Sequence, residues 1–226
     1  MTRKDELHRA LDSVRRRIAA AEKAAGRPAA SVRLLPVSKF HPVEDIALLA
    51  ELGVDAVGEN REQEARAKAE ALPQVNFHMI GQIQAKKTNS IARWAAAVHS
   101  VDSVRIAEHL DHGVARAIER GERAPGTLDC FVQWSADGDT ARGGVDASGL
   151  DDVYAAIEKA EHLNLRGLMC VPPLGADAEE TYRTARRLAG DLELSAGMSA
   201  DLEAAIAAGS DIVRVGTQIF GPRPVA

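Results

Sequence analysis

Lys39 stands where a short apolar segment of the chain ends. The segment covers residues 33–39 and is followed at once by Phe40, which places Lys39 at the exit of the first expected strand. A lysine amine in such a position can form a Schiff base with a carbonyl compound, because the unprotonated primary amine is a nucleophile. Lys39 is therefore the first candidate for covalent chemistry.

A second group of residues, near the end of the chain, is suited to holding a phosphate. Ser199 offers a hydroxyl and backbone N–H groups at an expected helix start, where the helix dipole favours an anion by a few tenths to about 1 kcal/mol. Gly216 lets the backbone approach a phosphate closely, and Thr217 adds a second hydroxyl. Each of these residues alone is more simply an N-cap or a turn residue. Together they indicate a phosphate site, and a lysine beside a phosphate site suggests pyridoxal 5'-phosphate.

Hydrophobic segments rich in Val, Ile and Leu alternate with longer, Ala-rich segments of helical period. This alternation is typical of a parallel sheet whose strands are joined by helices. The expected strands lie near residues 33–38, 54–58, 76–80, 96–100, 128–134, 164–171, 191–195 and 211–215. Eight strand and helix units in 226 residues predict an α/β fold, a single (β/α)8 TIM-type barrel domain covering residues 1–226.

An additional helix is expected before the first strand. Leu7, Leu11, Val14 and Ile18 recur at helical spacing opposite charged residues. The segment therefore predicts an amphipathic N-terminal helix that packs against the domain. The alternative fold is a doubly wound open sheet, but no Gly-x-Gly-x-x-Gly motif follows the first strand.

Polar and glycine-rich residues gather at the carboxyl ends of the expected strands. In a barrel of this kind the site is built from the loops at that end, and phosphates are commonly held after strands seven and eight. Asn60 follows strand two, and His78 ends strand three. Lys39, Ser199 and Gly216 follow strands one, seven and eight. The order of the elements therefore predicts that these residues share one site.

Composition disfavours several classes of function. The formal net charge of -5 gives no reason to expect nucleic acid as a partner, because binding to a phosphate backbone relies on clustered Lys and Arg. The two cysteines, Cys130 and Cys170, could not by themselves complete a four-ligand zinc site, and we expect no metal. No segment approaches the ~20 apolar residues that span a bilayer. We expect a cytoplasmic protein without a membrane partner, and a monomer.

The chain resembles the pyridoxal phosphate homeostasis proteins, single-barrel relatives of the alanine racemase N-terminal domain. The similarity covers nearly the whole chain and is most specific from Gly197-Met198-Ser199-x-Asp201 through Arg214-x-Gly216-Thr217 to Ile219-Phe220-Gly221. The other matching stretches are Val37-Ser38-Lys39 with Pro42, Gly58-Glu59-Asn60 with Gln63-Glu64, His78 with Ile80-Gly81 and Gln84, and Gly167-Leu168-Met169. One departure is Arg61, where the family commonly has an aromatic residue.

The resemblance implies a set of cofactor-binding residues and no catalytic ones. The set consists of Lys39, Asn60, His78, Met198, Ser199, Arg214, Gly216 and Thr217. Lys39 would form the internal aldimine, and Arg214 would face the pyridine nitrogen. Ser199, Gly216 and Thr217 would bind the phosphate, and Asn60 would lie beside the ring.

The expected site favours holding the cofactor over using it in catalysis. An arginine at the ring nitrogen is already charged and can only donate, so Arg214 should leave the ring a weaker electron sink than a carboxylate would. A racemase also needs an acid or base on each face of its substrate. The two tyrosines, Tyr154 and Tyr182, fall in helical segments away from strand ends. We therefore expect reversible binding and delivery of the cofactor, with little or no turnover.

Two alternatives to a carrier stay open. The first is a pyridoxal phosphate-dependent amino-acid racemase, with His78 as the best remaining candidate for a base. The second is a Schiff-base aldolase, which combines a lysine with a phosphate site and predicts a colourless protein that binds sugar phosphates. For a carrier, the expected partners are pyridoxal phosphate itself and apo enzymes that use it.

Overall fold

Eight parallel strands form the centre of the molecule. The computed structural model describes residues 1–222, and for Arg142 the backbone alone. The strands are β1 (Arg33–Pro36), β2 (Ala56–Glu59), β3 (Asn76–Met79), β4 (Ala95–Val101), β5 (Leu128–Trp134), β6 (Leu163–Cys170), β7 (Glu193–Ser195) and β8 (Ile212–Val215). Their order in the sheet is β1-β8-β7-β6-β5-β4-β3-β2. Every strand lies within about two residues of a predicted segment, so the strand prediction is confirmed.

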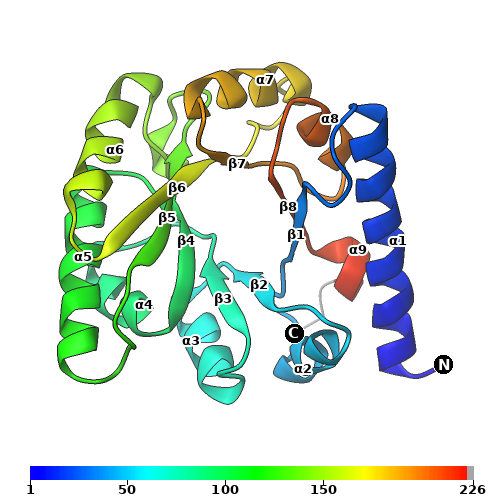
Figure 1. Ribbon diagram of the computed structural model, residues 1–226, viewed down its shortest axis with the longest axis horizontal. Coiled ribbons are helices and arrows are strands. Elements are labelled where there is room, and N and C mark those ends of the chain that lie inside the picture. The colour runs from blue at the N-terminus through cyan, green and yellow to red at the C-terminus, as the bar shows by residue number, and fades with distance from the viewer. Residues whose placement is uncertain (223–226) are drawn as a thin grey trace.

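The sheet closes where its two edge strands, β1 and β2, meet. Val37 forms a parallel bridge with Gly58, and the Ser38 N–H donates to the Gly58 carbonyl oxygen at 3.0 Å. Figure 1 shows the strands arranged in a ring, with the helices outside them. This arrangement is a TIM-type α/β barrel. The predicted fold is therefore confirmed, and the open doubly wound sheet is excluded.

Helices connect the strands on the outside of the barrel. They are α1 (Arg3–Ala24), α2 (Val43–Glu51), α3 (Glu62–Ala71), α4 (Thr88–Trp94), α5 (Val104–Glu119), α6 (Leu150–Lys159), α7 (Ala178–Ala189), α8 (Leu202–Ala207) and α9 (Thr217–Phe220). Short 3-10 helices occupy Ala85–Lys87, Thr140–Arg142 and Ala147–Gly149. Within residues 1–222, no helix combines the length and the apolar character that crossing a bilayer requires.

The N-terminal helix α1 is the additional helix that the sequence predicts. It begins with a capping box in which Thr2 accepts from the backbone of Asp5 and Asp5 accepts from the backbone of Thr2. Its apolar face, which includes the buried Leu7 and Leu11, packs against α2, α8 and α9. Because α8 and α9 have only six and four residues, α1 supplies most of the cover on that side of the barrel (Figure 1).

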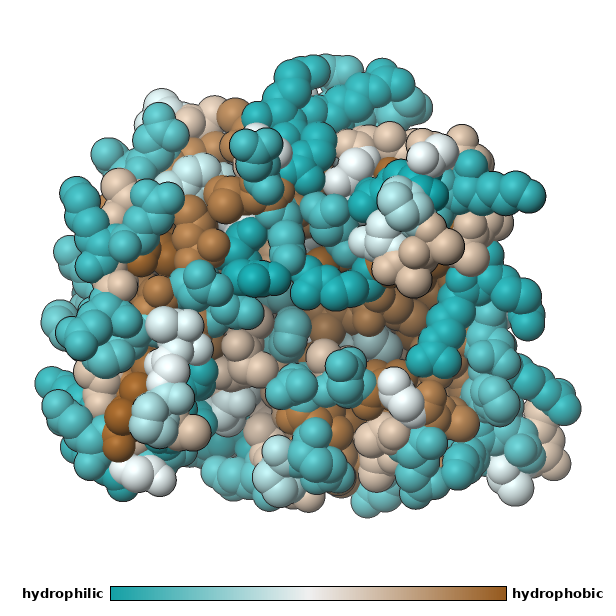
Figure 2. Space-filling view, in the orientation of Figure 1, coloured by the Kyte–Doolittle hydropathy of each residue, from teal (hydrophilic) through white to brown (hydrophobic). Residues whose placement is uncertain are grey.

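The core lies mainly between the strands and the surrounding helices. Inside the barrel a small apolar cluster consists of Leu35, Phe131, Met169 and Ile212. The barrel also encloses buried polar side chains, among them that of Arg214, which is only 4% exposed. Hydrophilic side chains cover most of the face seen in Figure 2, and hydrophobic ones are visible between them. Arg214 is also one of the predicted site residues, so the candidate site includes part of the barrel interior.

Candidate functional site

The loops that carry Lys39, Asn60 and Gly216 leave neighbouring strands at the same end of the barrel. β1 pairs with β8 up to Pro36 and Val215, and the Val37 N–H donates to the Val215 carbonyl oxygen at 2.9 Å. A Cβ atom on Gly216 would lie 3.2 Å from the Val37 carbonyl oxygen, which is closer than side chains usually approach. Glycine at position 216 therefore lets the turn after β8 pack directly against the segment that leads to Lys39.

Lys39 lies in a tight turn directly after β1. The His41 N–H donates to the Ser38 carbonyl oxygen at 3.1 Å, which closes the turn around Lys39 and Phe40. Phe40 has a positive φ of 70°, a left-handed conformation that costs a non-glycine residue roughly 1–2 kcal/mol. The half-buried Lys39 is therefore presented by a short, conformationally restricted turn.

Asn60 follows β2 and is held by a close backbone contact. A Cβ atom on Gly81 would lie 2.1 Å from the Asn60 carbonyl oxygen, a separation that no side chain could adopt. Only glycine at position 81 allows the segment after β3 to approach Asn60 this closely. A cavity of about 250 Å³ opens beside Asn60 and is also lined by Gln133, Ser135 and Met169. Open space therefore remains next to Asn60 at the carboxyl ends of the strands.

Ser199 lies in a turn and does not start a helix, in contrast to the sequence expectation. The Met198 N–H donates to Asp201 Oδ1 at 2.6 Å, and the Asp201 N–H donates to the Met198 carbonyl oxygen at 3.2 Å. α8 begins only at Leu202. The difference arises because the Asp201 side chain folds back on the turn. The features suited to an anion are the hydroxyl and backbone N–H groups at Ser199 and at Gly216-Thr217. The dipoles of α8 and α9 contribute less because these helices are short.

Arg17 joins the two turns that the sequence predicts for a phosphate. Its Nη1 donates to the Ser199 carbonyl oxygen at 3.2 Å and also to the Gln218 side chain, one residue after Thr217. Its Nε and Nη2 donate to Glu203, each at 2.8 Å. Sequence reasoning missed Arg17, because its partners lie 182 and 201 residues away and α1 carries several other arginines.

Arg214 is a buried cation at the centre of the barrel. Its Nη1 donates to the carbonyl oxygen of Ser195 at 2.6 Å and to Ser195 Oγ at 2.8 Å, and its Nη2 donates to the Cys170 carbonyl oxygen at 2.9 Å. None of these acceptors, the only ones among residues 1–222, is a carboxylate. Burial lowers the pKa of the guanidinium. A buried cation without an anionic partner is suited to a further electron-rich acceptor.

His78 is connected to Arg214 through two intermediate side chains. His78 Nδ1 lies 3.0 Å from His99 Nε2, and His99 Nδ1 lies 2.9 Å from Ser195 Oγ. Since Ser195 Oγ accepts from Arg214, the contacts of His99 with both neighbours are hydrogen bonds when Ser195 donates to His99 Nδ1 and His99 Nε2 donates to His78 Nδ1. This assignment requires two neutral imidazoles. Sequence reasoning missed His99, which lies inside an apolar strand.

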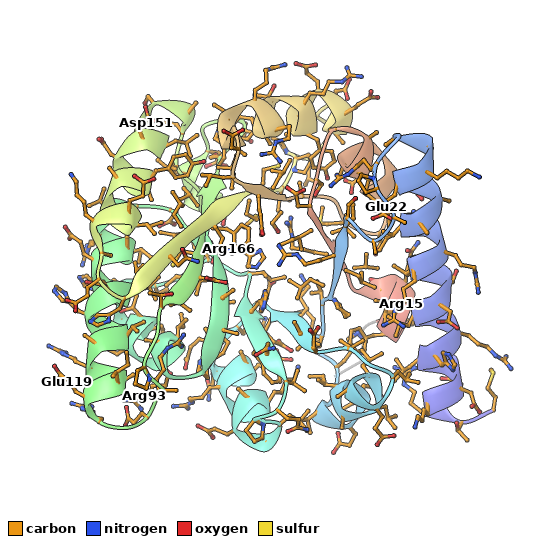
Figure 3. The ribbon with its side chains drawn as sticks, in the orientation of Figure 1. Arg15, Glu22, Arg93, Glu119, Asp151 and Arg166 are labelled. Atoms are coloured by element: carbon orange, nitrogen blue, oxygen red, sulfur yellow. The ribbon has the colours of Figure 1, made fainter. Side chains whose placement is uncertain are left out.

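The pKa values of the two histidines agree with that assignment. Burial lowers the pKa of His78 to about 4 and lowers the pKa of His99 well below its ordinary value. His78 also lines a cavity of about 540 Å³ with Asn76 and Asp55, near the amino ends of the strands. Arg15 and Glu22 line the same cavity, and Figure 3 shows them on the side of α1 that faces the barrel. His78 therefore lies behind Arg214, away from the turns of Ser199 and Gly216.

Tyr182 is buried close to the end of a strand. It belongs to α7 and is fully buried; burial and the nearby Asp201 and Cys170 raise the pKa of its hydroxyl. Tyr182 lies in a helix, as expected, and Cys170, the last residue of β6, is near it in space. The side chain reaches inward from the helix to the sheet.

A family model and several curated proteins match this chain over most of its length. The family model described as alanine racemase, N-terminal domain, matches residues 10–224. A Corynebacterium glutamicum protein named pyridoxal phosphate homeostasis protein is 61% identical in an alignment of 208 residues that covers 88% of this chain and 94% of that protein.

Solved structures with the same fold include the following two. A protein from Bifidobacterium adolescentis superposes with a TM-score of 0.85 at 33% identity and covers 96% of each chain. PipY from Synechococcus elongatus, solved with PLP bound, superposes with a TM-score of 0.79 at 32% identity and covers 95% of this chain and 100% of that chain. The chain therefore belongs to the alanine racemase N-terminal domain family and, within it, to the pyridoxal phosphate homeostasis proteins.

Proposed function

We propose that this protein binds pyridoxal 5'-phosphate as an aldimine of Lys39 and acts in the homeostasis or delivery of the cofactor, with little or no catalysis. The observation that supports this most is the packing of the turn after β8 against the segment before Lys39, with Gly216 at the contact. One small phosphorylated aldehyde requires an amine and an anion-binding turn in such proximity. The PLP bound to PipY supports the same reading.

The residues at this end of the barrel fit the cofactor. In the proposal Ser199, Gly216 and Thr217 hold the phosphate, and Arg214 donates to the ring nitrogen. The buried guanidinium fits this role because its protein acceptors are carbonyl oxygens and a hydroxyl, which leaves N–H groups for another acceptor. Asn60 and Met198 lie beside the ring, and we assign His78 an indirect role behind Arg214. When bound, the cofactor supplies the aldehyde that reacts with the amine.

The surroundings of the site support binding of the cofactor without catalysis. A racemase needs an acid or base on each face of its substrate. Tyr182 is fully buried, and His78 is separated from Arg214 by His99 and Ser195. The arginine in place of a carboxylate near the ring nitrogen would also weaken the ring as an electron sink. The relatives are named for homeostasis of the cofactor, which agrees with this proposal.

The spectrum of the purified protein tests the binding proposal. We expect a yellow protein that, after borohydride reduction, carries the cofactor on the peptide containing Lys39. Lys39→Ala should lose both the colour and the label, whereas Lys86→Ala, at an exposed lysine in the 3-10 helix after β3, should keep both. A Lys39→Ala protein with an unchanged spectrum would contradict the assignment of Lys39.

Chiral analysis tests the proposed lack of turnover. We expect no more than trace racemisation when the loaded protein is incubated with a panel of amino acids. Robust racemisation that disappears in Lys39→Ala would instead establish the racemase alternative. Since Lys39, Asn60, Ser199, Arg214 and Gly216 come from one chain, we also propose that a monomer suffices, which sedimentation of the loaded protein would test.

A further inference from the structure

A buried ionic cluster lies directly behind Lys39. Lys68 of α3 donates through Nζ to Glu59 Oε1 and Glu64 Oε1, both at 2.7 Å, and to the Ser38 carbonyl oxygen at 2.9 Å. Ser38 Oγ donates to the same Glu59 oxygen at 2.6 Å. The side chain of Lys68 is 8% exposed and that of Glu59 is 0% exposed. These charges are therefore not a solvated surface pair.

The cluster binds the backbone on both sides of Lys39. Lys68 donates to the carbonyl oxygen of Ser38, the residue before Lys39. Glu64 Oε1 accepts the N–H of Phe40, the residue after Lys39, at 2.7 Å. The ammonium and the carboxylate therefore each hold one end of the short segment that carries the candidate amine.

The turn around Lys39 needs such support because of its backbone conformation. Turns with a positive φ at the third residue usually have Gly or Asn at that position. Here Phe40 occupies it with a φ of 70°, and the guanidinium of Arg61 lies 5.0 Å from the centre of its ring. Without the bond to Glu64, the Phe40 peptide could relax to an ordinary φ. That relaxation would redirect the side chain of Lys39.

Glu59 extends the cluster to a second site residue. It directly precedes Asn60, and its buried Oε2 has no hydrogen-bond partner among residues 1–222. Burial also raises the pKa of the Glu59 carboxyl. Well-packed apolar residues usually stabilise a core as well as a buried ion pair does. The cluster is therefore poorly explained by stability alone.

We propose that Lys68 and Glu64 are positioning residues for Lys39, which clamp the strained turn so that its amine points at the incoming aldehyde of the cofactor. The proposal deepens the proposed function and rests on it for the identity of the aldehyde. The clamp itself is a property of the protein without cofactor. Within the clamp, Lys68 binds Ser38 and Glu59, and Glu64 binds Phe40.

The main test is the double variant Lys68→Met/Glu59→Gln. It removes both charges of the fully buried pair, and the remaining carboxylate, Glu64, has a partly exposed side chain (24%) and keeps the Phe40 N–H as a donor. It also removes the donor to the Ser38 carbonyl oxygen. We expect a thermal midpoint near that of the wild type and a rate of borohydride-trapped pyridoxal phosphate on Lys39 that falls at least about tenfold. A folded double variant that traps the cofactor at the wild-type rate would overturn the proposal.

A second pair of variants tests Glu64 while Lys68 and Glu59 remain unchanged. Glu64→Gln keeps an oxygen that can accept the Phe40 N–H, so we expect trapping within about threefold of wild type. Glu64→Ala removes the acceptor and should slow trapping at least about tenfold. Equal rates in the two variants would overturn the assigned role of Glu64.

A cofactor-free measurement separates this proposal from the proposed function. In the apo protein, competitive acetylation of Lys39 against the exposed Lys23 is measured by peptide mass spectrometry across pH. The Lys39 profile should shift toward that of Lys23 in the double variant. Arg186→Met is the matched control, because Arg186 binds the Gly190 and Gly209 carbonyl oxygens far from this cluster; it should destabilise the protein without shifting the profile.

The outcomes of the two readouts are distinguishable. If wild-type protein traps no pyridoxal phosphate but the acetylation profile shifts as expected, the proposed function fails and the clamp stands. If the profile of Lys39 is the same in wild type and in both the double variant and Glu64→Ala, the clamp proposal fails whatever the cofactor does. A shift of equal size in Arg186→Met would also overturn it, since the effect would then report general loosening.

Discussion

Acidification below neutral pH should destabilise this protein through the two histidines inside its barrel. Burial lowers the pKa of His78 to about 4 and that of His99 in the same direction. In the unfolded chain each imidazole regains an ordinary pKa near 6.5. Because the folded pKa lies below the unfolded one, the contribution of each histidine to the free energy of unfolding is fully present above a pH of about 6.5. It is lost as the pH falls toward the folded pKa.

The magnitude for His78 follows from its two pKa values. Between roughly pH 7 and pH 5 the unfolded ring takes up nearly a full proton, while the folded ring, with a pKa of about 4, stays mostly neutral. Linkage then gives a loss of roughly 2 kcal/mol in the free energy of unfolding over this interval. Carboxyl groups such as Asp146, whose pKa is lowered by its hydrogen bond from Ser148, lose their contribution only at lower pH.

Urea unfolding at pH 7, 6 and 5, followed by fluorescence of Trp94 and Trp134, measures this loss. In His78→Gln the fall between the two extremes should be smaller than in wild type by roughly 2 kcal/mol. The matched control is His112→Gln, at an exposed histidine of α5, which should keep the wild-type fall. Parallel pH dependence in wild type and His78→Gln would refute the reasoning, because His78 could not then be a neutral ring with a depressed pKa.

Three further changes test the candidate site. Arg17→Ala removes the link between the two segments proposed to hold the phosphate and should weaken pyridoxal phosphate binding by about tenfold in equilibrium dialysis. Pyridoxal, which lacks the phosphate, should bind as before, and equal weakening of both would contradict the role of Arg17. Gly81→Ala places a Cβ atom against the Asn60 carbonyl oxygen and should lower the free energy of unfolding by roughly 1–3 kcal/mol in urea; unchanged stability would show that the approach is not tight. Arg214→Gln should shift the absorbance maximum of the bound cofactor, and an unaltered spectrum would remove Arg214 from beside the ring.

The architecture could be predicted because its signals are local. Each strand is a short run of Val, Ile and Leu, and each intervening segment has helical period, so the eight units of the barrel can be counted in sequence order. Parallel strands in a closed sheet bring their carboxyl ends together. For that reason the shared position of Lys39, Asn60 and Gly216 at one end of the barrel could be expected before the structure was known.

The side-chain environment of the site could not be predicted in the same way. Arg17 and Arg15 lie on the same helix and look alike in sequence, yet of the two only Arg17 bonds to both Ser199 and Gln218, in the segments proposed to hold the phosphate. Ser199 was expected to start a helix, but the Asp201 side chain folds the preceding residues into a turn. Such differences depend on which partners the packed elements present, and those partners are far away in sequence.

The sequence by itself determined the order of the elements, the closed barrel and the end at which Lys39 and the glycine-rich turns meet, because hydrophobic periodicity and strand direction are properties of neighbouring residues. Only the tertiary structure decided the interior of the barrel and the support behind Lys39. Ser195 and His99 are 96 residues apart, and Lys68 and Ser38 are 30 residues apart. Polar contacts over such separations exist only once closure of the sheet has removed the side chains from water, where each buried group must find a partner.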